Sequence, residues 1–409
     1  MTGRRGRTVV VTGLGAVSPF GTGVKAFWQG ITAGACAIRP ITLIETEGFR
    51  SRIAAEVPGA VGGSARRARA DRLALTAASE ALDDARLSAA ERRDAALMVG
   101  AVGGGMLEVE AWYWKRWRGA REHPDAGRER PGAGRERPDA ARATLPTSHA
   151  DVLSWRLGLE GPRETVVAAC SSGAASIAMA ADLIADGVVP RALAGGADAL
   201  TRICYMGFNA LRLLDPEPCR PFDRERRGMS LGEGAAFLVL EDAESARARG
   251  ATLYAELAGH AMTTDAFHVT SPHPEGHGMI GAMREALASA GAAPADVAYV
   301  NAHGTGTAQN DRIEARALRA VFGEGGVLVS STKSMIGHTM AAAGSLEALA
   351  TVLAMTHAVV PPTVHLTSPD PDVPFDCVPG VARAASLPAA MSNSFGFGGQ
   401  NVTLLFRAC

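Results

Sequence analysis

The chain has 409 residues, a formal net charge of −1 and 47% hydrophobic side chains, with a mean hydropathy of +0.06. This size and apolar content allow a large buried core, equivalent to about two or three ordinary domains or one duplicated unit. The near-neutral charge gives no electrostatic case for nucleic acid or an anionic membrane as a partner. The six cysteines are scattered without a C-x-x-C pair, which predicts unpaired thiols in a reducing cytoplasm.

The N-terminal segment predicts a buried strand with a glycine turn. A run of valines from Val9 is interrupted by Gly13 and Gly15, which disfavours a signal peptide. The turn is similar to a dinucleotide-binding loop, but Ser18 stands where that motif has its third glycine, and no acidic residue closes a clear second strand about 20 positions later. We therefore expect no nucleotide site here. No apolar run reaches the roughly 18 residues that a membrane span needs.

Strand-like apolar runs alternate with alanine-rich helical segments along the rest of the chain. The expected strands are 95–100, 192–197, 235–240 and 297–300, and the expected helices are 69–84 and 279–291. Alternation of this kind predicts a layered α/β fold. Glycine and other small residues near the strand ends indicate close packing of helices on the sheet and tight turns.

One segment departs from this alternation. After Trp112 the chain becomes rich in arginine, glycine and proline, and the unit Gly-Arg-Glu-Arg-Pro begins at 127 and again at 134. We expect a solvated, flexible insertion over about 116–143. The alternative is a docking surface for an acidic partner, with Trp112, Trp114 and Trp117 packed at its base.

Cys170 is the strongest candidate for a reactive group. The run from Thr165 predicts an apolar strand that leads directly into a helix of small residues, with Cys170 at the junction. The unsatisfied N–H groups and the positive dipole end of a helix start lower the pKa of a thiol and favour the thiolate. His303 and His338 follow in similarly compact settings, each at an expected strand end. One cysteine with two such histidines predicts a thiol enzyme.

Other groups could support a thiol nucleophile. Backbone N–H groups at the helix start supply one donor for an oxyanion, and the glycine loop 396–399 is flexible enough to bring a second. The alternative for this loop is an ordinary tight turn between strands. Two histidines without an obvious metal partner indicate proton transfer or hydrogen-bond donation. Lys333 is a candidate for fixing the local electrostatics, with Glu347 as its counter-charge.

We expect no metal site. His268, His273 and His277 cluster in one segment, but no cysteine or carboxylate at ligand spacing supports them. We therefore interpret these three side chains as loop histidines rather than as ligands of a metal ion.

Four separated motifs, in this order and spacing, resemble those of the elongating β-ketoacyl-acyl carrier protein synthases. They are Thr165–Asp182 around Cys170, Asn301–Thr307, Ser331–His338 with Gly344–Glu347, and Asn393–Asn401. The resemblance extends over nearly the whole chain, and Lys333 with His338 favours the Cys–His–His elongating type over initiating synthases, which carry Cys–His–Asn. It implies a thiolase-like α/β fold, with two similar βαβαβαββ halves in five layers, α-β-α-β-α. We expect these halves to span 1–250 and 251–409.

The resemblance implies a two-stage reaction. Cys170 would accept an acyl chain from the phosphopantetheine thiol of an acyl carrier protein. A malonyl carrier protein would then lose CO₂, and its enolate would attack the Cys170 thioester in a Claisen condensation. His303 and His338 would stabilise this enolate, and His303 would also assist decarboxylation. Lys333 would hold the charge arrangement with Glu347, and no tightly bound cofactor is expected.

Supporting residues also follow from the resemblance. The N–H groups of Cys170 and Phe397 would form the oxyanion hole, and Phe397 would gate the acyl pocket, with Asp265 in a loop that pairs with the gate. Expected substrate-binding positions are Thr305 and Thr307, which would hold the pantetheine arm, and Gly103, Phe208, Gly398 and Gly399. Because carrier proteins are acidic, basic docking residues are expected at Arg66, Arg67, Arg69 and Arg212, although each also fits an ordinary solvated helix face.

The identity of the acyl substrate depends on departures from the fatty-acid pattern. Cys170 lies in Ala-Cys-Ser-Ser-Gly, and Gly103 stands where the fatty-acid enzyme with the closest pattern has a branched apolar residue in its acyl pocket. A glycine there would widen the pocket or admit a rigid chain. Together with the insertion, these departures favour a ketosynthase of a type II polyketide pathway over a fatty-acid elongating synthase.

Two readings from other classes are disfavoured. A non-catalytic chain-length-factor subunit lacks the nucleophilic cysteine, and a cysteine hydrolase would need a path for activated water.

The family usually forms dimers, so we expect either a homodimer or a heterodimer with a cysteine-lacking chain-length-factor paralogue. The sequence leaves that choice open, together with the length of the acyl chain.

Overall fold

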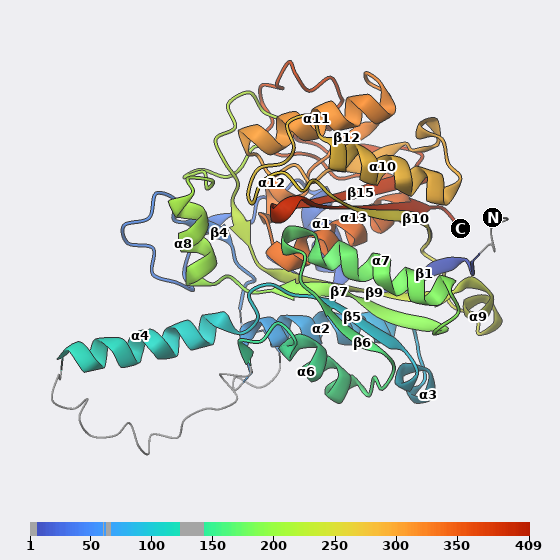
Figure 1. The fold of residues 1–409 in the computed structure, drawn as a ribbon, viewed down its shortest axis with the longest axis horizontal. Helices are drawn as coiled ribbons and strands as arrows, with labels where there is room; N and C mark the ends of the chain where they lie inside the picture. Colours follow the sequence, from blue (N-terminus) through green and yellow to red (C-terminus); the bar gives the residue numbers. More distant parts are fainter. Residues whose placement is uncertain (1–5, 60, 63–66, 123–142) are drawn as a thin grey trace.

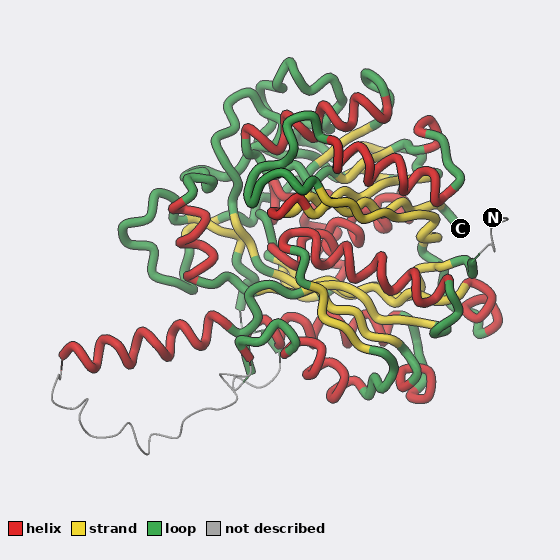
Figure 2. The backbone as a smooth tube through the Cα atoms, viewed as in Figure 1, coloured by secondary structure: helices red, strands yellow, loops and turns green. Residues whose placement is uncertain are grey.

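The computed structural model describes residues 6–59, 61–62, 67–122 and 143–409. Figure 1 traces these residues along the chain, and Figure 2 shows two layers of strands with helices between them and on their outer sides. No helix in the described ranges combines the length and the apolar character that crossing a bilayer requires.

The N-terminal part of the chain contributes nine strands and eight helices to the described structure. The strands are β1 (Val9–Ser18), β2 (Gly21–Thr22), β3 (Arg39–Pro40), β4 (Ile53–Ala55), β5 (Ala96–Gly100), β6 (Arg163–Val166), β7 (Arg191–Asp198), β8 (Leu231–Gly232) and β9 (Gly234–Asp242). The helices are α1 (Val24–Thr32), α2 (Arg69–Asp84), α3 (Ala89–Arg93), α4 (Met106–Glu122), α6 (Ser148–Leu157), α7 (Ser172–Ala185), α8 (Arg202–Ala210) and α9 (Ala243–Ala248).

The C-terminal part is shorter. Its strands are β10 (Ala255–Thr264), β11 (Tyr299–Asn301), β12 (Leu328–Ser330), β13 (Val359–Val360), β14 (Arg383–Ala384), β15 (Ala389–Gly396) and β16 (Gln400–Arg407). Its helices are α10 (His277–Ala290), α11 (Ala308–Phe322), α12 (Lys333–Ile336) and α13 (Ala343–His357).

The two parts repeat one strand pattern. In the first, β5 pairs in parallel with β6 and β7, while β9 is antiparallel to β7 and to β1. In the second, β11 pairs in parallel with β12 and β15, while β16 is antiparallel to β15 and to β10. A short antiparallel pairing of β1 with β10 joins the two sets. The repeated order is that of a duplicated α/β unit.

Helices α7 and α13 form the layer between the two sets of strands. Every residue of α13 from Ala343 to Ala354 is buried, as expected for a mostly apolar helix packed in a core. Its side chains share a hydrophobic cluster with those of α7, β1, β9 and β16. Helix α2 packs on the outer face of β1 and β9, and α10 packs on β10 and β16 (Figure 1). The five α-β-α-β-α layers confirm the predicted thiolase-like fold.

The glycines of β1 serve the packing of α2. A Cβ atom on Gly15 would lie 2.0 Å from the carbonyl oxygen of Ala77, and one on Gly13 would lie 2.3 Å from that of Ala81. Only glycine therefore allows the helix to approach the strand this closely. The resemblance to a dinucleotide-binding turn has this structural origin.

Most expected elements are formed, and the helix expected at 279–291 is α10, His277–Ala290. The predicted helix 69–84 is α2, and the strands expected near 95–100, 192–197 and 235–240 are β5, β7 and β9. The strand expected at 297–300 is shorter, because a 3₁₀ turn at Pro294–Asp296 delays its start to Tyr299. Residues 116–122, expected within a flexible insertion, continue helix α4, and the repeats at 127 and 134 lie outside the described residues.

Candidate active site

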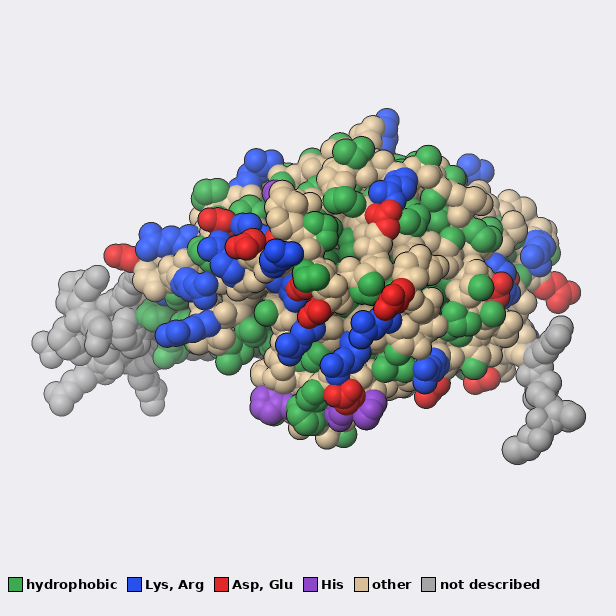
Figure 3. Space-filling view, turned by 90° about the horizontal axis from the view of Figure 1, so that it is seen from above, with side chains coloured by type: hydrophobic (Ala, Val, Ile, Leu, Met, Phe, Trp, Pro, Cys, Tyr) green, Lys and Arg blue, Asp and Glu red, His purple; other side chains and the backbone are tan. Residues whose placement is uncertain are grey.

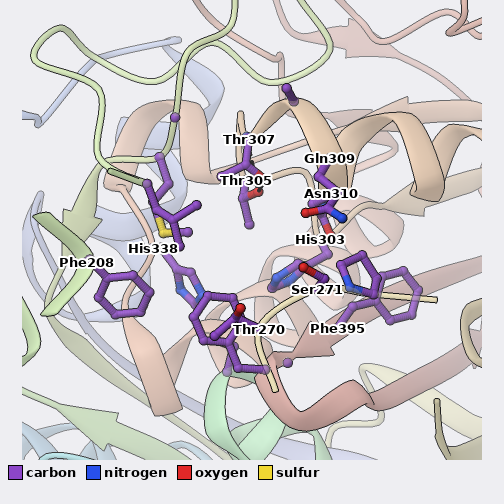
Figure 4. Close-up of a pocket in the computed structure, with 18 of the residues that line it drawn as sticks. Phe208, Thr270, Ser271, His303, Thr305, Thr307, Gln309, Asn310, His338 and Phe395 are labelled. Carbon is purple, nitrogen blue, oxygen red and sulfur yellow. Dashed lines mark hydrogen bonds between the residues drawn. The ribbon is translucent and has the colours of Figure 1, made fainter. Parts of the chain in front are cut away.

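Cys170, His303 and His338 line one cavity, although they come from different parts of the chain. Figure 4 shows the rings of both histidines in the space between Phe208 and Phe395. The centroids of the two imidazoles are 5.5 Å apart and their planes are nearly perpendicular, at 87°. One thiol and two imidazoles therefore face the same cavity and can act on one substrate together.

Cys170 lies in a 3₁₀ turn, Ala169–Ser171, that leads directly into α7. The expected strand before it ends earlier, because β6 stops at Val166. Ala169 adopts a left-handed conformation with φ of 47°, which is uncommon for a residue with a side chain. Backbone strain of this kind occurs at functional turns, where the surrounding structure fixes the direction in which a reactive side chain points.

The environment of Cys170 raises rather than lowers the pKa of its thiol. Burial is the largest cause and brings the pKa to about 11, whereas the N–H groups of Phe397 and of Cys170 itself and the charge of Lys333 act in the opposite direction. The prediction of a lowered thiol pKa was therefore wrong, because loss of hydration outweighs the helix start. The resting thiol is protonated, and it must lose its proton as it reacts.

His303 follows β11 and takes one defined tautomer. Lys333 donates from Nζ to the carbonyl oxygen of His303 at 2.7 Å, and Nζ lies 3.2 Å from Nδ1 of the same residue. An ammonium group can only donate, so Nδ1 accepts and the proton of the neutral ring is on Nε2. Burial and then the charge of Lys333 hold the pKa of His303 well below its ordinary value of 6.5.

His338 takes the same tautomer by a different contact. Its Nδ1 accepts the backbone N–H of Met340 at 3.2 Å, while Nε2 is buried without a partner among the described residues. Burial and the charge of Lys333 lower its pKa well below 6.5. His338 is not at a strand end as expected: it lies beyond α12, where its N–H donates to Ser230 and the chain forms an isolated bridge with Leu231.

Lys333 and Glu347 form a buried ion pair behind His303. Their side chains are 1% and 2% exposed. Burial raises the pKa of Glu347 to about 7, and the neighbouring Lys333 opposes this shift. Lys333 contacts His303 and its charge helps to lower the pKa of both imidazoles, while the carboxylate of Glu347 compensates the buried cation.

Three buried acids of this region were not anticipated from the sequence. Glu314 accepts the N–H groups of His303 and Gly304, both at 2.8 Å, and burial raises its pKa to about 7. Asp311 accepts the N–H groups of Phe222 and Gly306. The spacing of Asp311 and Glu314, three residues apart at the start of α11, was the available signal, because it places both on one helix face.

The third acid, Asp198 at the end of β7, accounts for the position of Gly103. Asp198 accepts the N–H of Gly103 at 2.7 Å and that of Ala341 at 2.9 Å. A Cβ atom on Gly103 would lie 3.1 Å from the Asp198 carboxylate. Gly103 is not among the described residues that line the cavity, so its expected contact with substrate is not seen there.

Phe397 and Gly399, in the loop after β15 that we expect to act as a gate, line the cavity together with Thr305 and Thr307, whereas Gly398 is not among the described residues that line it. The ring of Phe397 packs on Phe208 with centroids 5.6 Å apart. The N–H of Asp265 donates to Gly399 and that of Gly398 donates to Val269, so the segment after β10 is tied directly to the gate loop.

The threonine hydroxyls form the polar wall. Thr305 and Thr307 lie on one side of the cavity in Figure 4, and their hydroxyl oxygens are 2.9 Å apart. This arrangement suits a narrow polar arm that carries amides toward the thiol.

The expected docking arginines differ in their surroundings. Arg69 is buried and paired with Glu233 at 2.6 Å, and it also donates to the carbonyl of Val57, so its assignment to docking was wrong. The sequence could not show this, because the partner lies far along the chain. Arg212 is exposed at the cavity, Arg67 is half-buried, and Arg66 lies outside the described residues.

The histidine segment after β10 has no group of ligands suited to a metal ion within the described residues. His273 stacks on His277 with centroids 4.4 Å apart, and His273 also packs on Phe267. These contacts account for the cluster as ring packing.

Family comparisons cover most of the chain. A family model described as Beta-ketoacyl synthase, N-terminal domain, matches residues 6–246, and one described as Beta-ketoacyl synthase, C-terminal domain, matches residues 254–367. A 3-oxoacyl-[acyl-carrier-protein] synthase 2 from Synechocystis is 37% identical over 98% of this chain and 98% of its own.

Solved structures extend this likeness to the fold. The ishigamide ketosynthase/chain length factor matches with a TM-score of 0.91 and 36% identity, over 99% of this chain and 100% of the other. A type II PKS acyl-carrier protein in complex with its ketosynthase bound to the hexaketide matches with a TM-score of 0.88 and 31% identity, over 99% and 100%. By sequence and by fold, the chain belongs to the β-ketoacyl synthase family.

Proposed function

We propose that the protein is a ketosynthase that joins an acyl chain held on Cys170 to a malonyl unit by decarboxylative Claisen condensation. One observation carries this proposal: two neutral histidines, each with its proton on Nε2, share a cavity with a buried thiol. A thioester enolate needs donors at its oxygen, and two imidazole N–H groups supply them without a metal ion.

The first stage loads the thiol. Cys170 attacks the acyl thioester of a carrier protein, the new C–S bond forms, and the pantetheine thiol leaves with the proton that Cys170 gives up. The N–H groups of Cys170 and Phe397, both of which act to lower the pKa of the thiol, would donate hydrogen bonds to the developing oxyanion. Thr305 and Thr307 would hold the pantetheine arm in position.

The second stage forms the carbon–carbon bond. The malonyl thioester oxygen accepts hydrogen bonds from the Nε2–H groups of His303 and His338. The carbon–carbon bond to the malonyl carboxylate then breaks, CO₂ leaves, and the electrons of that bond enter the enolate. The enolate carbon then attacks the Cys170 thioester, and the thiolate leaves. Because Lys333 disfavours protonation of both rings, they remain neutral donors throughout decarboxylation.

We propose that the acyl chain is an intermediate of a type II polyketide pathway. The likeness to ketosynthase/chain length factor and type II PKS structures supports this, as does the Arg/Pro-rich insertion. Fatty-acid elongation is the alternative, and the likeness to a 3-oxoacyl-[acyl-carrier-protein] synthase 2 supports it. Cys170 and both histidines argue against a non-catalytic chain-length-factor role.

An acidic acyl carrier protein is the proposed partner in solution. Figure 3 shows Lys and Arg side chains gathered over the left half of one face, interspersed with Asp and Glu, and Arg212 lies exposed at the cavity. Six free thiols support a reducing, cytoplasmic setting. We place the boundary between the two halves at 250/251, in the connection between α9 and β10.

We also propose a dimer. Strand β6 lies at one end of the large sheet; Val167, which follows it, is 61% exposed, and Trp155, on α6, is 74% exposed. An unprotected edge of this kind is suited to pairing with another chain. Either a second copy or a cysteine-lacking paralogue would fit this surface.

The test is a reconstitution with defined acyl- and malonyl-carrier proteins, read by product mass. We expect a β-ketoacyl carrier protein from the parent protein and none from Cys170→Ala, which should also lose labelling by cerulenin-like electrophiles. Labelling of another cysteine with unchanged condensation would contradict the assignment. Adding a candidate partner subunit separates a self-sufficient enzyme from one half of a heterodimer.

A further inference from the structure

Helix α4 caps the starts of two other helices with two of its carboxylates. Glu110 accepts the N–H groups of Arg202 and Ile203, both at 2.8 Å, at the start of α8. Glu108 accepts the N–H of Arg69 at 2.7 Å at the start of α2. A carboxylate at a helix start satisfies N–H groups that have no partner within the helix and also meets the positive end of the dipole.

A second contact holds the start of α8 on α4. The guanidinium of Arg202 lies 5.4 Å from the ring centroid of Trp114, on α4, and 5.4 Å from that of Phe49. Its Nη1 also donates to the carbonyl of Glu45 at 2.6 Å. The first residue of α8 is therefore fixed by its backbone through Glu110 and by its side chain through two aromatic faces.

The other end of α8 reaches the gate. Phe208 is 8% exposed and belongs to a buried cluster with Tyr205 and Met229, against which Phe397 packs. Because α8 is one short regular helix, a shift at its first turn is transmitted to Phe208. The contact of Phe208 with Phe397, at 5.6 Å between centroids, is where such a shift would be felt.

We propose that Glu110 is a positioning residue for acyl selection: by fixing α8 it holds Phe208 behind Phe397 and so restrains the gate against long acyl chains. This inference rests on the proposed function, since it assigns a selectivity to that same site. A short acyl group needs little movement of Phe397, whereas a long chain must displace both rings. Weakening the cap therefore favours long chains over short ones.

Glu110→Gln and Glu108→Gln form a matched pair of variants. Each variant removes one carboxylate of α4 that caps another helix: Glu110 caps α8, whereas Glu108 caps α2. We measure the rates at which Cys170 is acylated from octanoyl- and acetyl-carrier protein. The octanoyl-to-acetyl ratio should rise about fivefold in Glu110→Gln, equivalent to part of one cap, and stay within about twofold of the parent in Glu108→Gln. A general loss of stability would move both rates and both variants alike.

Alkylation of Cys170 gives a readout that does not need the reaction. Rates with iodoacetamide and its N-octyl analogue are compared in parent and variants, after subtracting the labelling of Cys170→Ala. The ratio of the alkylation rate with the N-octyl analogue to that with iodoacetamide should rise in Glu110→Gln alone. An unchanged or lower ratio in this assay overturns the inference. If neither carrier acylates the parent protein while the alkylation ratio rises as expected, the proposed function fails and acyl selection with it, but Glu110 still restrains the access of long chains to Cys170.

Discussion

Lys333 lies with Nζ 3.2 Å from Nδ1 of His303, so a buried cation fixes which nitrogen of that imidazole carries the proton. The same ammonium group is paired with Glu347 and donates to the carbonyl of His303. The lysine thus orients the ring, sets its tautomer and opposes its protonation. These three effects depend on one charge in a site that excludes water, where charges interact strongly.

Replacing Lys333 tests this arrangement. In Lys333→Met the tautomer of His303 is no longer fixed and Glu347 loses its buried counter-charge. We expect malonyl decarboxylation to fall by about 10²-fold or more, as when an oriented donor is lost, and the unfolding free energy to fall by about 3–5 kcal/mol. Carbon dioxide release and urea denaturation measure the two effects.

The double variant Lys333→Met/Glu347→Gln separates them. Removing both charges avoids an uncompensated buried carboxylate, so much of the stability should return. Decarboxylation should remain low, because the contact with His303 is still missing. Recovery of activity along with stability would show that the lysine acts on the fold alone.

The two substitutions His338→Ala and His338→Gln test hydrogen-bond donation. Alanine removes the Nε2–H donor, and we expect decarboxylation to fall by about 10²–10³-fold. Glutamine offers a neutral N–H near the same position and should recover part of this loss. Acylation of Cys170 from an acyl carrier protein, followed by intact mass, should change little in either variant. Equal losses in both stages would contradict the division of roles between the thiol and the histidines.

The fold was predictable from the sequence because its signals are local. Helix 69–84 has the expected bounds, and the alternation of strands with alanine-rich helices predicted the α/β layers. The strand expected from Val297 is shorter than predicted, since a 3₁₀ turn precedes it. The helical continuation of α4 through 116–122 was hidden by the arginine-rich composition of the segment.

The site was harder to predict from the sequence, because its properties depend on contacts between residues that are far apart in the chain. The small residues around Cys170 indicated a helix start, but nothing in that motif showed how completely the thiol would be buried. Arg69 resembled a surface arginine until Glu233, far along the chain, was seen beside it. The role of Glu314 depends on the turn that brings the N–H of His303 to α11. Desolvation and long-range pairing leave little trace in a single sequence.

The contrast between Arg69 and Arg212 can be measured. Arg69→Met leaves Glu233 buried without its partner and should lower the unfolding free energy by about 3–5 kcal/mol. Arg212→Ala removes an exposed cation at the cavity and should leave stability within about 0.5 kcal/mol of the parent. Its KM for carrier protein should rise several-fold at low salt, with the difference shrinking as salt screens the interaction. A ratio of variant to parent KM that does not change with salt would argue against electrostatic docking at Arg212.

Glu314 links the site to the pH dependence of stability. Burial raises its pKa from 4.5 to about 7, so the folded protein holds a proton on this carboxyl where the unfolded chain has lost it. The stabilising contribution is present below about pH 4.5 and is lost as pH rises through about 7. The stability difference between the parent and Glu314→Gln should therefore fall by roughly 1.4 kcal/mol per pH unit within that window. His303 and His338, whose pKa values are lowered, act in the opposite sense, but they are common to both proteins and cancel in the difference.

Glu285→Gln, on the exposed face of α10, controls for the loss of a carboxylate as such. A difference that stays constant from pH 4.5 to 7 would mean that Glu314 is ionised in the folded site, held by the N–H groups of His303 and Gly304 against its burial.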